Sequence, residues 1–171
     1  AFVVCGSRTL AGRGVLDEII DTAGSEGVEA IHVETLSREP EVDDVDRVAE
    51  LVRERGVAPS DFLLALGGGA AIDLAKATAA MATNRESLTV KDYMEGVGRG
   101  LKLTEEPLPV LAMPTTAGTG AEATKNAVIS SYDPPFKTSL RDQRLVPRIA
   151  LIDPELSASV PPEVTAASGM D

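Results

Sequence analysis

The segment from residue 62 to residue 82 constrains the fold of this chain more than any other part of the sequence. Residues 62–66 form a short, continuously apolar run, which is typical of a strand in a parallel sheet whose two faces are both covered. Three glycines follow at positions 67–69, and residues 70–82 are good helix formers. The sequence therefore predicts a central parallel strand, a tight turn, and a helix that begins directly on the turn.

This glycine turn has the chemistry of an anion site. Gly68 and Gly69 carry no Cβ atom, so a phosphate group can approach their backbone closely. The free N–H groups at the start of the following helix, and the partial positive charge there, also favour a bound anion. A tight turn that binds nothing would have the same local sequence, because a lone glycine triplet is a weak signal.

A second loop has a complementary composition. Residues 109–113 form another apolar run, and residues 114–120 then read Pro-Thr-Thr-Ala-Gly-Thr-Gly. Threonine hydroxyls can bond to phosphate, ribose or amide groups without adding charge. Ligand sites in open α/β sheets collect at the carboxyl ends of strands, and both loops occupy that edge. An ordinary surface connection explains this composition less well, so the pair of loops predicts a nucleotide site.

The other elements alternate between strand and helix along the chain. Such alternation with short turns is typical of a parallel sheet with right-handed crossovers. We therefore predict an α/β fold, with a Rossmann-like, mainly parallel sheet, helices on both faces and a small β-hairpin excursion. Residues 84–106 are polar and rich in glycine, and we expect them to wrap around the surface. The remaining expected elements are strands at 2–5, 29–34 and 148–152, helices at 16–23 and 42–55, a hairpin of 127–132 with 137–140, and a helix that starts at Asp153 and Pro154.

The composition argues against several classes of protein. A formal charge of −11 argues against nucleic-acid binding, because contacts to a phosphate backbone need clustered lysine and arginine. One cysteine cannot form an internal disulfide, and no run approaches the roughly 18 apolar residues of a membrane span. With no signal-peptide pattern in view, we expect an acidic cytoplasmic protein without nucleic-acid or membrane partners.

The length of 171 residues suits one domain with a substantial core. The chain starts inside an apolar run and stops at Asp171 without a closing element, so we expect residues 1–171 to be one domain of a longer protein. Cys5 lies on the first apolar run, where a small buried hydrophobe is expected. His32 lies on the second expected strand, and we interpret it as a core or edge residue rather than a metal ligand.

Three strings of residues are specific enough to compare with known families. They are Gly-Gly-Gly-Ala-Ala-Ile-Asp-Leu-Ala-Lys at 67–76, Pro-Thr-Thr-Ala-Gly-Thr-Gly-Ala-Glu at 114–122, and Asp-Pro-Glu-Leu with a later Ser-Gly-Met-Asp between 153 and 171. In this order they resemble the group III, iron-containing alcohol dehydrogenases. The resemblance implies an NAD(P)-dependent oxidoreductase that interconverts alcohols with aldehydes or ketones by metal-assisted hydride transfer. It also implies a dehydroquinate-synthase-like N-terminal domain, of which this chain is the NAD(P)-binding part, while a helical metal-binding C-terminal domain is absent.

The resemblance implies roles for residues in and near both loops. Gly68, Gly69 and Ala70 would hold the pyrophosphate of the cofactor, NADP or NAD, through backbone N–H groups. The other implied contacts are Thr115, Thr116 and Thr119 with the adenine-side and phosphate region, Lys137 at a basic position near the cofactor, and Leu156 near the adenine.

Asp73 and Lys76 follow the glycine turn by one and two helical turns. Asp73 cannot bind phosphate, because like charges repel. It could accept a hydrogen bond from a ribose hydroxyl or a turn amide, or simply cap the helix, and we include it among the cofactor-binding residues. Lys76 is expected to be a helix-surface residue or an ion-pair partner rather than a cofactor contact.

Gly6, Ser7 and Arg8 depart from the pattern of NAD-preferring relatives, which tend to carry an acidic residue after the first strand. A glycine leaves room there, and a serine hydroxyl with an arginine guanidinium can bind a 2′-phosphate. The sequence therefore favours NADP or dual use, and we include all three residues among the cofactor contacts. The alternative is that Arg8 merely points into solvent. Ala70 and Ala121, where relatives usually carry serine, each lose one hydroxyl contact.

Asp171 matches the first metal ligand of the family, and a hard carboxylate suits Fe²⁺ or Zn²⁺. The family's other ligands are histidines, which this chain lacks at matching positions. The metal would act as the Lewis acid on the substrate oxygen. We therefore expect residues 1–171 alone to have negligible dehydrogenase activity.

Other functions stay open at this point. A non-catalytic nucleotide-binding sensor would keep both loops and lose the metal chemistry. Maleylacetate reductases, glycerol dehydrogenases and dehydroquinate synthases share the fold, but each differs in at least one of the motifs and fits less well. A plain protein-interaction domain must treat both loops as coincidence. For the enzyme, we expect a small-molecule alcohol or aldehyde as substrate, and the chain is compatible with a homo-oligomer.

Overall fold

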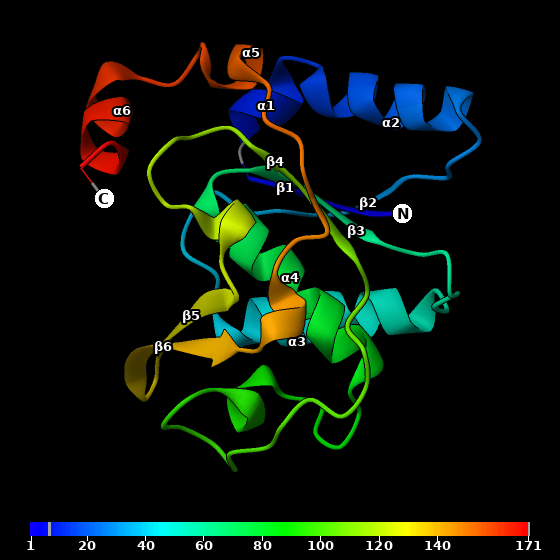
Figure 1. The fold of residues 1–171 in the computed structure, drawn as a ribbon, viewed down its shortest axis with the longest axis vertical. Helices are drawn as coiled ribbons and strands as arrows, with labels where there is room; N and C mark the ends of the chain where they lie inside the picture. Colours follow the sequence, from blue (N-terminus) through cyan, green and yellow to red (C-terminus); the bar gives the residue numbers. More distant parts are fainter. Residues whose placement is uncertain (7, 171) are drawn as a thin grey trace.

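The computed structural model describes residues 1–6 and 8–170, with the side chains of Arg8 and Thr9 outside that description. A five-stranded sheet in the order β2-β1-β3-β4-β7 lies at the centre, and every neighbouring pair in it is parallel (Figure 1). The predicted mainly parallel α/β fold is therefore confirmed. The strands are β1 (Phe2–Cys5), β2 (Ile31–Thr35), β3 (Leu63–Gly67), β4 (Val110–Pro114) and β7 (Ile149–Ala150).

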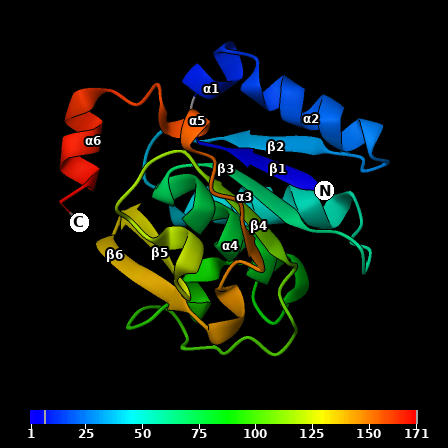
Figure 2. The same cartoon turned by 45° about the horizontal axis from the view of Figure 1, so that its top comes forward.

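Helices cover both faces of this sheet, as the sequence predicted. Figure 2 shows α1 (Arg8–Gly12) and α2 (Val15–Ser25) on one side, and α3 (Val42–Glu54) and α4 (Gly69–Thr83) on the other. The change of face follows from the strand order. The chain moves in one direction across the sheet from β1 to β2 and in the opposite direction from β2 to β3 and β4, and right-handed crossovers in opposite directions must pass over opposite faces. Helix α1 was not predicted, since five residues are too few for a periodic pattern.

Helix α4 is buried on all sides, which its composition allows because alanine, leucine and isoleucine occur around its whole circumference. The sheet lies on one side of it, and a hairpin of β5 (Asn126–Tyr132) with β6 (Pro135–Arg141) packs on the other. These two strands pair antiparallel and form a separate sheet, which confirms the predicted hairpin excursion.

The apolar core lies in two layers, one on each face of the sheet. Phe2 and Val4 join the layer beneath α3 and α4, whereas Val3 and Cys5 join the layer beneath α1 and α2. This alternation follows from the two-residue period of a strand. Cys5 is fully buried, as predicted.

The segment from residue 84 to residue 106 does more than wrap the surface as predicted. It contains the short helix η1 (Val90–Tyr93), and the side chains of Val90 and Tyr93 are buried in the core. The carboxylate of Asp46 on α3 accepts a hydrogen bond from the N–H of Val90 at 2.7 Å. The side chain of Asn84 donates to the carbonyls of Ala80 and Glu105, and its oxygen accepts from the N–H groups of residues 104 and 105.

The last part of the chain crosses the sheet edge and then forms two short helices, α5 (Pro154–Ser157) and α6 (Pro162–Ser168). Asp153 accepts a hydrogen bond from the N–H of Glu155 at 2.9 Å, which confirms it as the N-cap of α5. Strand β7 is shorter than predicted.

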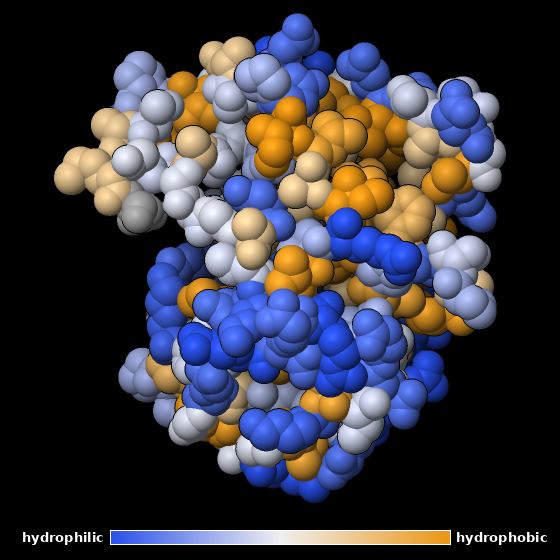
Figure 3. Space-filling model, viewed as in Figure 1, coloured by the Kyte–Doolittle hydropathy of each residue, from blue (hydrophilic) through white to orange (hydrophobic). Residues whose placement is uncertain are grey.

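The side chains of Ile149, Leu151 and Ile152 are exposed. Figure 3 shows apolar surface in the upper half of the molecule, where this segment passes, and mostly polar surface below. Within the described ranges, no helix is long and apolar enough to cross a membrane.

Candidate functional site

The strand order reverses between β1 and β3, and both predicted loops lie at that point. The chain leaves β1 toward β2 on one side and leaves β3 toward β4 on the other, so the connections that follow the two strands diverge and leave a crevice. The N–H of Gly6 donates to the carbonyl of Leu66 at 2.7 Å, which holds the two strand ends together. Crevices at such switch points are the usual ligand sites of open parallel sheets.

The glycine turn forms a cradle at the start of α4. The N–H groups of Ala71 and Ile72 both donate to the carbonyl of Gly68, at 3.1 and 3.2 Å. This geometry leaves the N–H groups of Gly69 and Ala70 without an acceptor inside the helix, as at any helix start. The cradle therefore offers backbone donors and the positive end of a helix of 15 residues to an anion.

The threonine loop packs directly against this cradle. The N–H of Thr115 donates to the carbonyl of Gly67 at 3.0 Å. A Cβ atom on Gly68 would lie 2.8 Å from the hydroxyl of Thr116, and one on Gly69 would lie 2.9 Å from the hydroxyl of Thr119. The predicted juxtaposition of the two loops is thus confirmed, and glycine at these positions makes the close approach possible.

Two pockets open on either side of the cradle and share Gly69 and Ala70 in their walls. The hairpin pocket, of about 430 Å³, lies between the start of α4, the threonine loop and the β5–β6 hairpin. The helix pocket, of about 450 Å³, lies between the cradle, the end of β1 and helices α5 and α6. The lining of the hairpin pocket includes Glu39, Asp73, Thr119, Thr124, Asn126 and Lys137, and that of the helix pocket includes Gly6, Arg38, Gly68, Thr115, Thr116 and Leu156.

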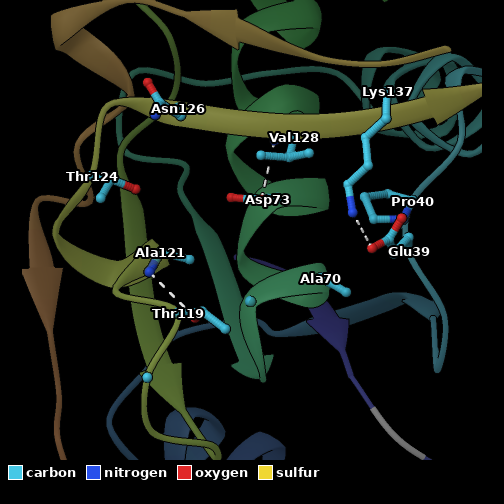
Figure 4. A pocket seen from close by; sticks show the side chains of 12 residues that line it. Glu39, Pro40, Ala70, Asp73, Thr119, Ala121, Thr124, Asn126, Val128 and Lys137 are labelled. Atoms are coloured by element: carbon cyan, nitrogen blue, oxygen red, sulfur yellow. Dashed lines mark hydrogen bonds and ion pairs between the residues drawn. The ribbon is translucent and has the colours of Figure 1, made fainter. Parts of the chain in front are cut away.

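Asp73 lines the hairpin pocket and bonds to a neighbouring strand (Figure 4). Its carboxylate accepts from the N–H of Val128 on β5 at 3.1 Å, and its second oxygen lies 3.5 Å from the ammonium of Lys76. The alternative that Asp73 caps the helix is wrong, because the N-cap position belongs to Gly68. Burial raises the pKa of Asp73, and the charge of Lys76 opposes that rise.

Lys76 was expected at the helix surface or in an ion pair, and only the second expectation is confirmed. Its side chain is fully buried, and it pairs with Asp73 one helical turn before it. Burial lowers the pKa of Lys76, and the negative charge of Asp73 opposes that change.

Lys137 reaches the hairpin pocket from β6, and its ammonium forms an ion pair with Glu39 in the loop after β2 (Figure 4). Glu39 also accepts a hydrogen bond from the hydroxyl of Ser130 at 3.2 Å. The hydrogen bond from Lys137 lowers the pKa of Glu39. Sequence reasoning missed Glu39, because nothing local marks a loop carboxylate whose partner lies 98 residues away.

The helix pocket contains a basic residue that sequence reasoning also missed. Arg38 lies just after β2, and its guanidinium donates to both carboxylate oxygens of Asp44, at 2.6 and 3.0 Å. The hydrogen bond to Asp44 raises the pKa of Arg38. Leu156 lines the same pocket, as does Gly6.

Some predicted residues lie outside the described part of the chain. Ser7 and Asp171 are not described, and Arg8 opens α1 with its side chain outside the description. Among the residues that are described, no group of three histidine, cysteine or acidic side chains is placed to hold a metal ion. His32 lies exposed on the edge strand β2, where its ring bonds to Glu34 and Thr35.

These features define an open, parallel α/β domain with a glycine cradle at its switch point. The sequence pattern of the family "Iron-containing alcohol dehydrogenase" matches residues 1–154. The chain therefore belongs to the iron-containing alcohol dehydrogenases, as its three motifs predicted.

Individual relatives agree with this membership. The 4-hydroxybutyrate dehydrogenase of Cupriavidus necator is 36% identical over 164 residues, which make up 96% of this chain and 41% of that protein. The NADPH-dependent butanol dehydrogenase of Clostridium saccharobutylicum is 32% identical over 171 residues, or 100% of this chain and 42% of that protein. The crystal structure of sulfoacetaldehyde reductase from Bifidobacterium kashiwanohense in complex with NAD⁺ superimposes with a TM-score of 0.86, at 32% identity over 99% of this chain and 43% of that one. The chain thus spans 41% to 43% of the length of these relatives.

Proposed function

We propose that residues 1–171 form the cofactor-binding domain of an NAD(P)-dependent oxidoreductase that interconverts alcohols with aldehydes or ketones. The observation that carries this proposal is the contact between the glycine cradle and the threonine loop, with one pocket on each side of it. A dinucleotide has two nucleoside halves joined by a pyrophosphate, and this arrangement offers two cavities joined by an anion site.

Each part of the cofactor has a matching set of residues. The backbone N–H groups at Gly68, Gly69 and Ala70 would hold the pyrophosphate, because they lie at the positive end of α4, where the first N–H groups have no acceptor within the helix. The adenosine half would occupy the helix pocket, against the apolar side chain of Leu156 and near Thr115 and Thr116. The nicotinamide half would then occupy the hairpin pocket, which is lined by Thr119, Asp73 and Lys137. Of the two pockets Thr119 lines only this one, so it would serve the nicotinamide half instead of the adenine side that the resemblance implies.

The two charged residues of the hairpin pocket would orient the nicotinamide half. The carboxylate of Asp73 can accept from a ribose hydroxyl or an amide, and the ammonium of Lys137 can donate to a ribose hydroxyl or phosphate oxygen. When bound, the nicotinamide ring supplies or accepts the hydride of the reaction. These residues would bind and orient the cofactor. The metal, Fe²⁺ or Zn²⁺, would be held by Asp171 together with ligands from outside residues 1–171.

For the choice between NADP and NAD, we infer NADP or dual use. The segment Gly6-Ser7-Arg8 carries no acidic residue that would repel a 2′-phosphate, and it supplies a hydroxyl and a guanidinium that can bind one. Among the relatives, the butanol dehydrogenase is NADPH-dependent and the sulfoacetaldehyde reductase is in complex with NAD⁺, so the family accommodates both cofactors.

Calorimetric titration of the full-length polypeptide with NAD and NADP tests the binding proposal. We expect saturable binding of at least one dinucleotide, and a loss of affinity of about tenfold or more in Gly69→Ala, whose methyl group would crowd Thr119 and narrow both pockets. Turnover of a panel of short alcohols and aldehydes with Fe²⁺ or Zn²⁺ then tests the reaction. Absence of binding by the wild-type protein, or wild-type affinity in Gly69→Ala, would contradict the assignment of the cradle.

A further inference from the structure

Lys76 is the largest fully buried side chain of the described chain, and its ammonium connects separate segments. It donates to the carbonyl of Ala121 at 2.9 Å, and it lies 3.4 Å from the hydroxyl of Thr124 and 3.5 Å from the carboxylate of Asp73. The partners Ala121 and Thr124 are 45 and 48 residues away in sequence. The ammonium therefore joins the middle of α4 to the far end of the threonine loop.

The contact at Ala121 continues to the glycine cradle. Ala121 begins the short helix η2 (Ala121–Ala123), and its N–H lies 3.5 Å from the hydroxyl of Thr119. That same hydroxyl packs against Gly69, where a Cβ atom would approach it to 2.9 Å. A displacement of Ala121 would thus be passed through Thr119 to the start of α4.

Asp73 extends the same arrangement to the β5–β6 hairpin. One of its oxygens faces Lys76, and the other accepts from the N–H of Val128 on β5. The buried pair of Asp73 and Lys76 consequently fixes the threonine loop and strand β5 to one helix. Helix α4, the threonine loop and strand β5 form most of the wall of the hairpin pocket, and the loop after β2 and Lys137 on β6 form the rest.

An apolar residue would fill this place in α4 at lower cost than a charged one. Removing an ammonium from water is unfavourable unless it gains good polar partners. The rest of α4 from Ala71 to Ala82 is almost wholly apolar and buried, so packing alone does not call for a lysine here. The side chain of Lys76 is fully buried, and it is not among the residues that line either pocket, although its partners Asp73, Ala121 and Thr124 line the hairpin pocket.

We infer that Lys76 is a positioning residue, whose ammonium holds the threonine loop against the glycine cradle in the arrangement that binds the dinucleotide. Asp73 supplies the counter-charge and fixes the hairpin wall. This inference rests on the proposed dinucleotide site, and it adds a residue that acts through the loop rather than on the cofactor. Without the ammonium, the loop and its threonine hydroxyls lose their fixed distance from the cradle.

The test compares Lys76→Met with the wild type in the full-length polypeptide. Methionine keeps most of the volume of the stem and removes the donor. We expect the dissociation constant and the KM for the dinucleotide to rise by about tenfold or more, with kcat at saturating dinucleotide changing by less than about threefold. Hydrogen exchange should become faster at residues 115–124 and stay unchanged in α3.

Lys125→Met is the matched control, because it removes an exposed ammonium next to the same loop. We expect it to leave the dinucleotide affinity and the exchange rates at wild-type values. A folded Lys76→Met protein with wild-type KM and wild-type exchange in the loop would overturn the inference. If the wild type itself binds no dinucleotide, the proposed function fails instead, so the two failures are distinguishable.

Lys76→Arg provides a second variant if Lys76→Met does not fold. Its longer guanidinium keeps a charged donor and displaces the carbonyl of Ala121, so we expect a folded protein with faster exchange in the loop and a raised KM for the dinucleotide. A folded Lys76→Arg protein whose loop exchanges faster while its dinucleotide affinity stays at the wild-type value would refute the positioning role.

Discussion

The backbones of Gly6 and Gly67 approach so closely that a Cβ atom on Gly67 would lie 2.6 Å from the Cα of Gly6. The same Cβ would lie 2.8 Å from the Cβ of Ala71 at the start of α4. These contacts join the carboxyl ends of β1 and β3 where the strand order reverses. Gly6 was interpreted from the sequence as leaving room for a cofactor, and the structure adds a packing reason for glycine at this position.

Gly67→Ala should therefore destabilise the domain by about 2–3 kcal/mol, because backbone atoms that cannot rotate away must move to admit the methyl group. Urea unfolding followed by circular dichroism measures this change. Gly24→Ala is the control: Gly24 lies in α2, and a Cβ atom there meets nothing within 4 Å. That substitution should leave stability unchanged or raise it by about 0.5 kcal/mol, as alanine suits a helix better. Equal effects of the two substitutions would contradict the packing argument.

Asn84→Ala should destabilise the domain by about 3 kcal/mol, since it removes the side chain that satisfies backbone groups of the following loop. Asn84 is buried, donates to the carbonyl of Glu105 and accepts from the N–H groups of Thr104 and Glu105. Thermal and urea unfolding measure the loss. Arg85→Ala, at the exposed neighbouring position, should change stability by less than about 0.5 kcal/mol. If Asn84→Ala were as stable as this control, the segment 84–106 would be held by other contacts.

Asp46→Asn should stabilise the domain at neutral pH, because burial raises the pKa of the Asp46 carboxyl. A pKa that is higher in the folded chain than in the unfolded chain means that the folded state binds more protons between the two values. The free-energy cost of the partly buried charge is thus fully present above the pKa of the folded state and disappears as the pH falls below the pKa of the unfolded state. An asparagine oxygen can still accept from the N–H of Val90.

Urea unfolding at a series of pH values from 7 to the acid range checks this expectation. The advantage of Asp46→Asn should shrink as the pH falls through the range in which the wild-type carboxyl takes up its proton. Glu50→Gln, at an exposed position one turn further along α3, should give no such advantage at neutral pH. A variant that is no more stable than the wild type at pH 7 would argue against a partly buried, charged Asp46.

Arg8→Ala should weaken the binding of NADP by about tenfold and leave that of NAD nearly unchanged, since only NADP carries the 2′-phosphate that a guanidinium recognises. Calorimetry with both cofactors on the full-length polypeptide gives the ratio. Arg13→Ala, an exposed arginine just after α1, is the control for a general loss of positive charge. A wild-type preference for NAD, or equal losses for both cofactors, would show that Arg8 does not select the cofactor.

The central part of the fold was predictable because its signals are local. An apolar run, a glycine triplet and a run of helix formers placed β3 and α4 to within about a residue. Helix α1 and strand β7 lack such a pattern. Helix α1 was therefore not predicted, and β7 is shorter than the predicted strand at 148–152. The burial of Val90 could not be predicted, because its N–H donates to the carboxylate of Asp46, which lies 44 residues earlier in the sequence.

At the candidate site, the loops were predictable and the partners of the charged side chains were not. Glycine and threonine act through their own backbone or a short hydroxyl, so their local sequence is informative. The burial of Lys76 depends on a carbonyl 45 residues away, and lysine is ordinarily solvated. One signal was present in the sequence: α4 is apolar around its whole circumference, which is typical of a helix covered on every side. Any charged residue in its middle should then be buried and paired.

In the binding mode that we propose, the wall of Gly69 and Ala70 that the two pockets share would make this domain bivalent toward a single ligand. A molecule long enough to place one half in each pocket would be bound at both halves and at the group that links them. Binding of one half would raise the effective concentration of the other half at its own pocket. The connected molecule would therefore bind more tightly than either half alone. Selection then depends on the length of the ligand as much as on the chemistry of either end.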